Sequence, residues 1–333
     1  MADSLLKRME EEVLIMSGAM GTMMAKMGAD LGGCINQWIL KHPEVYRDLV
    51  RDYFRVGCDI VSGGTFNLNR ISLAKFGLAE KAEELNRGMI RILKGVQPEG
   101  KYVSGSMGPT GRMLKPLGDV DPREAFEAYA EQARVLAESG AEIINILTMY
   151  DLEEAVIALR AAKKETPLPV FVSLAFNPGA QGYRTMMGVS PESAARRLDA
   201  EGADVIGANC GGVTLSQMTE VIRLMKANCR RPLMVKPNAG SPKIVEGKEK
   251  YTASPEEFAE HVGNWVGAGA RIVSACCGSS PSRSRRKSVM SAVKATLTSV
   301  LATRIADRRS AGCSSRRTTA RSRRWREPCK RLI

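Results

Sequence analysis

The sequence lacks the features that would place the chain in a membrane or send it across one. It contains no run of about 18 apolar residues, the minimum for a membrane-spanning helix. Its first twelve residues are rich in charge and include no apolar stretch of the kind found in signal peptides. These absences argue against a membrane protein and make the cytoplasm the expected location.

The sequence also has few histidines and lacks a dinucleotide-binding turn after its first expected strand. The only two histidines, His42 and His261, fall beside or inside expected helices, so neither is expected to act as a base or a metal ligand. No Gly-x-Gly-x-x-Gly turn follows the first expected strand, which weakens a dinucleotide-binding fold. The eight cysteines show no short secreted framework. They are therefore expected to be thiols or metal ligands rather than disulfides.

The formal net charge of +13 belongs to the end of the chain. Residues 282–333 hold 16 Lys and Arg against 2 Asp and Glu, whereas residues 1–281 hold 33 against 34. Two interpretations of this basic, Arg- and Ser-rich segment stay open. It is a disordered arm that binds nucleic acid, or a stretch read out of its natural frame in a GC-rich gene. The second is favoured because basic tails usually rely on Lys and lack Trp and Cys, so nucleic acid is not an expected partner.

Eight short apolar runs, each followed by small residues and a helical pattern, predict repeated βα units. The expected strands are 13–16, 59–62, 102–105, 142–147, 170–175, 204–208, 233–236 and 271–275. A similar phrase recurs where a helix gives way to a strand, beginning at Gly57, Gly140, Gly202 and Gly269. Glycine there ends the helix, and a β-branched pair starts a buried parallel strand.

Eight βα units in about 280 residues predict a closed (β/α)8 TIM barrel, with an open doubly wound sheet as the alternative. The barrel is expected over residues 1–281, and the irregular basic tail over 282–333. The eighth helix would have to come from the tail, where 289–302 is the best candidate.

Three cysteines follow the sixth and eighth expected strands. Cys210 follows strand 204–208, and Cys276 and Cys277 follow strand 271–275. Because the site of such a barrel lies at the C-terminal ends of its strands, the three thiols can converge. Three thiolates and one exchangeable position make a catalytic zinc site, which keeps a fourth, substrate thiolate electron-rich. The alternative is that these cysteines are small buried apolar residues. The other cysteines are assigned no role.

Five motifs rich in glycine and polar residues lie at expected strand ends. They are Gly18-Ala-Met-Gly-Thr22, Gly108-Pro-Thr-Gly111, Asn209-Cys210, Pro237-Asn-Ala-Gly240 and Cys276-Cys-Gly-Ser-Ser-Pro281. Together they resemble the homocysteine S-methyltransferase family, which includes betaine–homocysteine methyltransferase, and most closely its methionine synthase branch. The resemblance covers about residues 14–281. It implies that Cys210, Cys276 and Cys277 bind zinc. It also implies methyl transfer to homocysteine, giving methionine, from a donor of the methylcobalamin, betaine or S-methylmethionine type.

The strand-end loops and the resemblance together indicate the substrate contacts. These are expected at Ser17, Gly18, Ala19, Gly64, Thr65, Phe66, Thr148, Asn209 and Asn238. Where the family usually has an acidic residue, this chain has Ser17, Leu147 or Lys236. Gly64 likewise replaces a usual asparagine. A protonated amino group needs compensating partners when it is buried. The family pattern therefore leaves the ammonium group of homocysteine without its usual carboxylates.

Two enzymatic alternatives follow from these departures. In the first, the substrate thiol is homocysteine, and Asn238 and backbone groups replace the missing carboxylates. In the second, the zinc site handles another thiol or a methylated substrate together with a separate corrinoid protein. Lys236 and Arg184 then meet an anionic group, unless they are solvated rim charges.

A methylcobalamin donor would also need a separate corrinoid protein, docked over the barrel mouth, because no cobalamin domain is visible after the barrel. Methionines are more typical of a core at helical spacings, but they could form an adaptable docking surface. The candidates are Met20, Met23, Met24, Met27, Met186 and Met187. The expected partners are thus a small-molecule thiol and a corrinoid protein, with no membrane.

Overall fold

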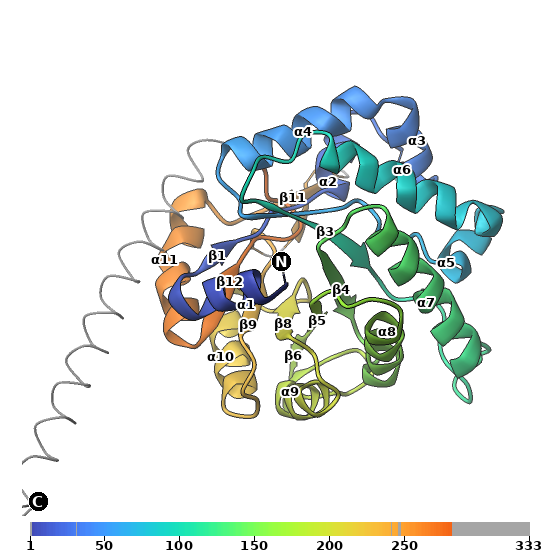
Figure 1. Ribbon diagram of the computed structural model, residues 1–333. Helices are drawn as coiled ribbons and strands as arrows, with labels where there is room; N and C mark the ends of the chain where they lie inside the picture. Colours follow the sequence, from blue (N-terminus) through green and yellow to red (C-terminus); the bar gives the residue numbers. More distant parts are fainter. Residues whose placement is uncertain (1, 31, 241, 246–247, 282–333) are drawn as a thin grey trace, which may run out of the picture.

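The computed structural model describes residues 2–30, 32–240, 242–245 and 248–281, which contain a closed barrel of eight parallel strands (Figure 1). Around the barrel the strand order is β1-β12-β9-β8-β5-β4-β3-β2. The strands are β1 (Leu14–Ile15), β2 (Ile60–Ser62), β3 (Tyr102–Met107), β4 (Ile143–Met149), β5 (Val170–Leu174), β8 (Val205–Asn209), β9 (Leu233–Lys236) and β12 (Ala270–Val273).

The two edge strands of this sheet meet and close it. A parallel bridge joins Met16 to Ile60. Backbone hydrogen bonds run from Asp59 N to Ile15 O at 2.7 Å and from Ser17 N to Ile60 O at 2.8 Å. The predicted (β/α)8 barrel is confirmed, and the open doubly wound sheet is wrong.

Helices that connect successive strands cover the outside of the barrel. They are α4 (Pro43–Arg55), α6 (Ala82–Lys94), α7 (Pro122–Glu138), α8 (Leu152–Glu165), α9 (Pro191–Ala200), α10 (Leu215–Lys226) and α11 (Pro255–Gly267). Shorter elements lie in the first two connections: α2 (Gly21–Lys26), α3 (Ile35–Lys41), α5 (Arg70–Ala74) and the 3-10 turn η1 (Ala79–Lys81). Across the described ranges, no helix combines the length and the apolar character needed to cross a membrane.

Local sequence signals account for where these helices begin and end. Asp121, Ser190 and Ser254 cap α7, α9 and α11 and accept backbone N–H groups at 3.0, 3.2 and 3.1 Å, each with proline in the first turn. The predicted junction glycines all have positive φ, between 84° and 113°. They end their helices in the left-handed conformation that glycine adopts without strain.

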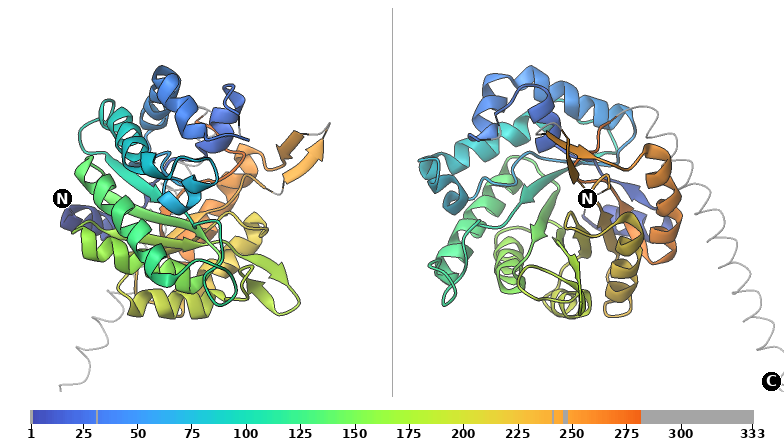
Figure 2. Two further views of the ribbon diagram at one scale, coloured as in Figure 1. Left: turned by 90° about the vertical axis from the view of Figure 1, so that its right-hand side faces the viewer. Right: turned by 180° about the vertical axis from the view of Figure 1, so that it is seen from behind.

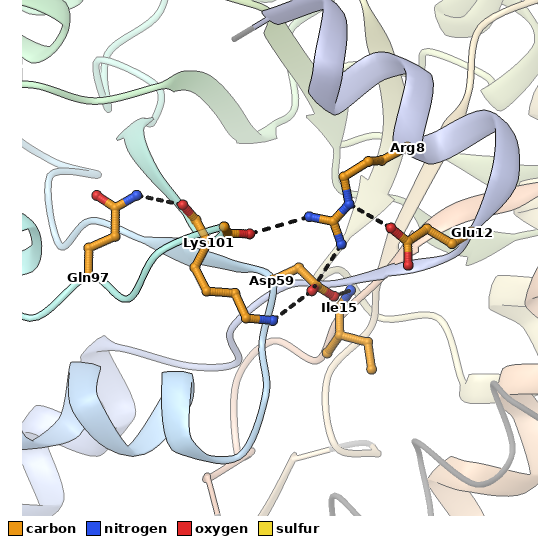
Figure 3. A network of polar contacts seen from close by, with 7 residues as sticks. Arg8, Glu12, Ile15, Asp59, Gln97 and Lys101 are labelled. Carbon is orange, nitrogen blue, oxygen red and sulfur yellow. Dashed lines mark hydrogen bonds and ion pairs between the residues drawn. The ribbon is translucent and has the colours of Figure 1, made fainter.

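The helix α1 (Ala2–Glu11) covers the end of the barrel at which the strands begin, an element that the sequence did not reveal (Figures 1 and 2). Leu5 and Met9 are buried in the same cluster as inward-facing strand residues such as Leu14. Figure 3 shows how polar contacts hold this helix in place. Arg8 binds Glu12 at 2.6 Å and Asp59 at 3.4 Å, and Lys101 binds Asp59 at 2.8 Å.

Two hairpins extend loops that leave the C-terminal ends of strands. One pairs β6 (Asn177–Gly179) with β7 (Gly182–Arg184) after β5. The other pairs β10 (Pro242–Val245) with β11 (Lys248–Tyr251) after β9. Figure 2 shows β10 and β11 projecting at the end of the barrel opposite to α1. Neither hairpin was predicted from the sequence.

A cavity of about 110 Å³ opens on the outer face of the barrel between α4 and α11. Its mostly apolar lining includes Ile15 and Val273 from the strands, Tyr53 and Phe258 from the helices, and Pro281. In a (β/α)8 barrel the helix that follows the last strand packs on this seam. The predicted source of that helix, 289–302, and the whole tail 282–333 lie outside the described residues. None of the three strand-end cysteines lines this cavity.

Candidate active site

The three strand-end cysteines converge at the mouth of the barrel. Cys210 directly follows β8, and Cys276 and Cys277 lie in the turn after β12. Their sulfur atoms all lie within 4.8 Å of one another. Only β9 separates β8 from β12 in the sheet, which explains how residues far apart in sequence come together. The predicted convergence is confirmed.

Backbone hydrogen bonds tie the loops that carry these cysteines to the end of β9. Cys210 N donates to Lys236 O at 3.1 Å, and Cys276 N donates to Pro237 O at 2.6 Å. Ala239 N in turn donates to the carbonyl oxygen of Cys277 at 2.9 Å. The segment 236–239 therefore connects both loops and fixes the spacing of the three sulfurs.

The turn at Cys210 depends on an uncommon backbone conformation. Cys210 has a φ of 52° and Gly211 a φ of 71°. A Cβ atom at position 211 would lie 2.1 Å from the carbonyl oxygen of Phe176, so only glycine fits there. A non-glycine residue with positive φ is uncommon and is often found at functional sites. Here the conformation turns the chain at the point where Cys210 meets Cys276 and Cys277.

Each sulfur strongly affects the ionisation of the others. The pKa of Cys276 is well below its usual value because the Cys210 and Cys277 thiols hydrogen-bond to its thiolate, and the charge of Lys236 adds to the effect. Interaction with Cys276 and Cys277, together with burial, raises the pKa of Cys210. For Cys277 the contact with Cys210 lowers the pKa, but Cys276 and burial outweigh it and raise the value to about 11. Each ionised sulfur therefore makes ionisation of its neighbours more costly, and a bound cation would lower that cost for all three.

The donor set fits zinc. A tetrahedral zinc ion with Zn–S bonds of about 2.3 Å places its sulfurs about 3.8 Å apart. Because the sulfurs already lie within 4.8 Å, shifts of about 1 Å or less would complete that geometry. Three protein ligands leave one corner of the tetrahedron for a further ligand, as in catalytic zinc sites.

The remaining cysteines and the histidines stay apart from this cluster. Among the described residues, no other group of three His, Cys, Asp or Glu side chains lies close enough to hold a metal ion. Cys34, Cys58 and Cys229 lie outside this cluster and form no disulfide bond. His261 is half-buried and stacks on Trp265.

The predicted contacts after β1 are largely occupied by the protein itself. Ser17 is fully buried, and its hydroxyl oxygen accepts from Ser62 N at 2.9 Å. The backbone N–H of Ala19 donates to Ser279 Oγ at 3.0 Å, and the same hydroxyl donates to Cys276 O at 2.7 Å. Gly18 lies against this hydroxyl, since a Cβ there would come within 2.4 Å of it. Ser279, which belongs to the Cys-Cys-Gly-Ser-Ser-Pro motif but had been assigned no role, links the β1 loop to the turn that carries Cys276 and Cys277.

The predicted contacts after β2 show a similar pattern. Gly64 N donates to Tyr46 Oη at 2.7 Å. The hydroxyl group of Thr65 is buried and exchanges hydrogen bonds of 2.8 Å with the backbone of Ser106. Phe66 is half-buried, and its carbonyl oxygen accepts Gly108 N at 2.8 Å. These groups hold β2 and β3 together at the mouth, and their contact with a substrate stays a prediction.

Asn209 and Thr148 form a bridge between strand ends. Asn209 Oδ1 accepts from Thr148 N at 2.8 Å and from Ser173 Oγ at 2.7 Å, and Asn209 Nδ2 donates to Thr148 Oγ1 at 2.7 Å. Thr148 has a φ of 60°, which this bridge stabilises. Asn209, the residue before Cys210, therefore ties the end of β8 to β4 and β5.

Asn238 is the predicted contact that keeps a buried polar atom available. Its Nδ2 donates to Gly211 O at 3.1 Å. Its Oδ1 is buried and has no hydrogen-bond partner within the described part of the chain. Asn238 lies between the two cysteine loops, next to Pro237 and Ala239, whose backbones bind Cys276 and Cys277. A buried acceptor without a donor is costly, so this oxygen suits a ligand that donates hydrogen bonds.

The two predicted cations differ in their surroundings. Lys236 is only 3% exposed, so the interpretation as a solvated rim charge is wrong for this residue. Arg184 is half-buried in β7 and donates to the carbonyl oxygen of Tyr183 at 2.8 Å. The methionines mostly belong to the core: Met24 is buried, and Met20 and Met23 pack against the core.

A few large apolar side chains remain exposed at strand-end loops. Met186, in the connection between β7 and α9, is 78% exposed, and Met27 is 40% exposed. Met113 and Leu117, in the loop between β3 and α7, are 48% and 71% exposed.

Comparisons with known proteins add to this geometry. The family model described as homocysteine S-methyltransferase matches residues 14–286. Methionine synthases of Mycobacterium leprae (strain TN) and Mycobacterium tuberculosis (strain ATCC 25618 / H37Rv) are both 30% identical over 299 residues, which is 84% of this chain. The matches cover 24% and 25% of those relatives, so the chain spans about a quarter of their length.

A solved structure supports the fold. The homocysteine methyltransferase MmuM from Escherichia coli, in its metallated form, superposes with a TM-score of 0.67 at 19% identity and covers 86% of this chain and 97% of its own. Its apo form gives a TM-score of 0.65 at 17% identity, covering 84% and 96%. At this level of identity the likeness shows that the two proteins share the barrel fold.

Proposed function

Because the chain belongs to the homocysteine S-methyltransferase family, we propose that it transfers a methyl group to the sulfur of homocysteine and forms methionine. The observation that carries the proposal is the meeting of the Cys210, Cys276 and Cys277 sulfurs within 4.8 Å at the barrel mouth. Three thiolates are a suitable ligand set for a catalytic zinc ion with one exchangeable position.

The chain's own residues prepare this site for a thiol substrate. Segment 236–239 holds both cysteine loops through backbone hydrogen bonds, so the three sulfurs are positioned before substrate arrives. When bound, zinc lowers the pKa of a thiol in its open position while leaving the sulfur nucleophilic. In the transfer, a bond forms between the substrate sulfur and the methyl carbon. The bond from that carbon to its donor breaks with its electron pair on the donor, and the thiol proton passes to solvent.

Asn238 supports homocysteine as the substrate even though the mouth lacks the usual acidic residues. Ser17 and Gly64 carry no charge, and Leu147 is a buried apolar residue. The unpartnered Oδ1 of Asn238 is an acceptor for the ammonium group of homocysteine. An amide oxygen binds ammonium less strongly than a carboxylate does. We therefore expect weaker selection for the amino group than a carboxylate would give.

A second acceptor class stays in the proposal for the same reason. A thiol acid without an amino group would lose no carboxylate partner in this site, so it competes with homocysteine. The methyl donor is one of the methylcobalamin, betaine or S-methylmethionine types. Methylcobalamin would arrive on a separate corrinoid protein, for which the exposed Met113, Leu117 and Met186 offer an apolar contact at the mouth. Nucleic-acid binding through the basic tail concerns residues outside the described part and gains no support from the site.

The test is a methyl-transfer assay on the zinc-supplemented full chain. Homocysteine and 3-mercaptopropionate are offered in turn with each of the three donors, and the thioether product is measured by mass spectrometry. We expect methionine from at least one donor, and a loss of more than about 100-fold in rate for Cys210→Ala. Cys34→Ala serves as the control, because Cys34 lies apart from the cluster. Product from 3-mercaptopropionate alone would select the second acceptor class, and no product from either thiol would contradict the proposal.

A further inference from the structure

Lys236 is a buried cation whose ammonium group is bound entirely by neutral oxygen atoms. Its Nζ donates to Ser17 O at 2.6 Å, to Ser274 Oγ at 3.1 Å and to Gly18 O at 3.4 Å. These three contacts use all three N–H groups. Among the residues that the structure describes, no carboxylate oxygen lies within the 4.0 Å of an ion pair with this nitrogen. The charge is therefore buried without an acidic partner from Asp or Glu.

Lys236 occupies the strand end that lies between the cysteine loops. In the sheet β9 pairs with β8 on one side, where Lys236 faces Asn209, and with β12 on the other. The carbonyl oxygen of Lys236 accepts the N–H of Cys210. Its ammonium group binds Ser274, two residues before Cys276. One residue thus contacts both loops of the thiol cluster, through its backbone on one side and its side chain on the other.

A buried ammonium group without an opposite charge is costly, by several kcal/mol. Backbone carbonyl dipoles offset part of this cost, but they carry no net charge. Burial lowers the pKa of Lys236, and negative charge on the nearby thiols, Cys276 first and then Cys210, Cys58 and Cys277, acts against that lowering. Three thiolates around a dipositive ion leave a net charge of minus one, and a single ammonium group neutralises it.

We propose that Lys236 is the counter-charge of the thiolate metal centre, a positioning residue that increases the affinity of the site for zinc. The inference rests on the proposed zinc site. It adds that the metal site of this chain is a unit of three sulfurs and one buried ammonium group. Ser17, Gly18 and Ser274 already accept the three N–H groups of Lys236. Its role as a counter-charge therefore needs no contact with the substrate.

The alternative is that Lys236 only links β1, β9 and β12 mechanically. Three variants separate charge from linkage. Lys236→Met removes both, Lys236→Arg keeps the charge and several donors, and Ser274→Ala removes one hydrogen-bond partner while leaving the charge. If Lys236→Met does not fold, Lys236→Gln replaces it, because the amide keeps a donor and removes the charge.

The experiment measures zinc affinity of the full chain by competition with a chromophoric chelator, alongside thermal unfolding of the metal-free protein. If Lys236 is a counter-charge, Lys236→Met should lose zinc affinity by about 10- to 100-fold, as is typical when a group that supports metal ligands is removed. It also predicts a loss of less than about 3-fold in Ser274→Ala and recovery of most of the affinity in Lys236→Arg.

Two results would overturn the inference while leaving the zinc site in place. One is that Lys236→Met, folded, binds zinc as tightly as the wild type. The other is that Ser274→Ala loses as much affinity as Lys236→Met. If the wild type itself binds no zinc, the proposed function fails first, so the two failures can be told apart.

Discussion

Replacing Asn209 with alanine tests whether this residue holds the barrel mouth together. The change removes the acceptor of Thr148 N at 2.8 Å and of Ser173 Oγ at 2.7 Å, and the donor to Thr148 Oγ1. Ser173 is fully buried, so water does not readily replace the lost partner, whereas Thr148 is half-exposed. A buried polar group left without a partner costs about 1–3 kcal/mol. Because the change removes several such contacts, we expect the free energy of unfolding to fall by about 2–4 kcal/mol.

The assay is urea unfolding of the full chain followed by circular dichroism, with Asn67→Ala as the control. Asn67 is an exposed asparagine in the loop after β2, and its replacement is expected to change stability by no more than about 0.5 kcal/mol. If Asn209→Ala also changes stability by less than about 0.5 kcal/mol, the bridge to β4 and β5 contributes nothing and the reasoning is refuted. Asn209 would then be free to act as the substrate contact that the resemblance implies.

Two further changes test other parts of the structure. Glu154 is buried and accepts Thr110 N, Thr110 Oγ1 and Tyr129 Oη at 2.7, 2.7 and 2.9 Å, so Glu154→Ala is expected to cost about 2–4 kcal/mol in urea unfolding. Burial raises the pKa of Glu154 above its unfolded value, so the native state binds the extra proton more readily. Relative to Glu154→Gln, the wild type should therefore gain stability as the pH falls through the raised pKa, and a loss over that range would contradict the assignment. Asn238→Ala is expected to raise KM for homocysteine about 10-fold while leaving zinc binding unchanged, and an unchanged KM would remove Asn238 from substrate recognition.

The barrel could be predicted because its signals are local and repeated. The junction glycines at 57, 140, 202 and 269 each mark the end of a helix and the start of a buried strand. Capped helix starts with a proline in the first turn added independent boundaries. The convergence of the three cysteines followed from the barrel topology, since strand ends of a closed parallel barrel meet at one mouth.

The parts that could not be predicted depend on tertiary contacts. The helix α1 is short and charged, and only the burial of Leu5 and Met9 against the barrel interior explains it. The buried state of Lys236 depends on carbonyl groups of the β1 loop, more than 200 residues away in sequence. Asn209 was expected to contact substrate, but its bonds to Thr148 and Ser173 depend on how three strands meet. Such contacts leave no periodic signal in the sequence.

The central claim is that Cys210, Cys276 and Cys277 hold one zinc ion. Its most direct test is the metal content of the purified full chain, measured by inductively coupled plasma mass spectrometry for the wild type, Cys210→Ala and Cys34→Ala. The account predicts about one zinc per chain in the wild type and in Cys34→Ala, and less than about a tenth of that in Cys210→Ala. A wild type without zinc, or a Cys210→Ala variant that keeps a full zinc ion, would contradict it.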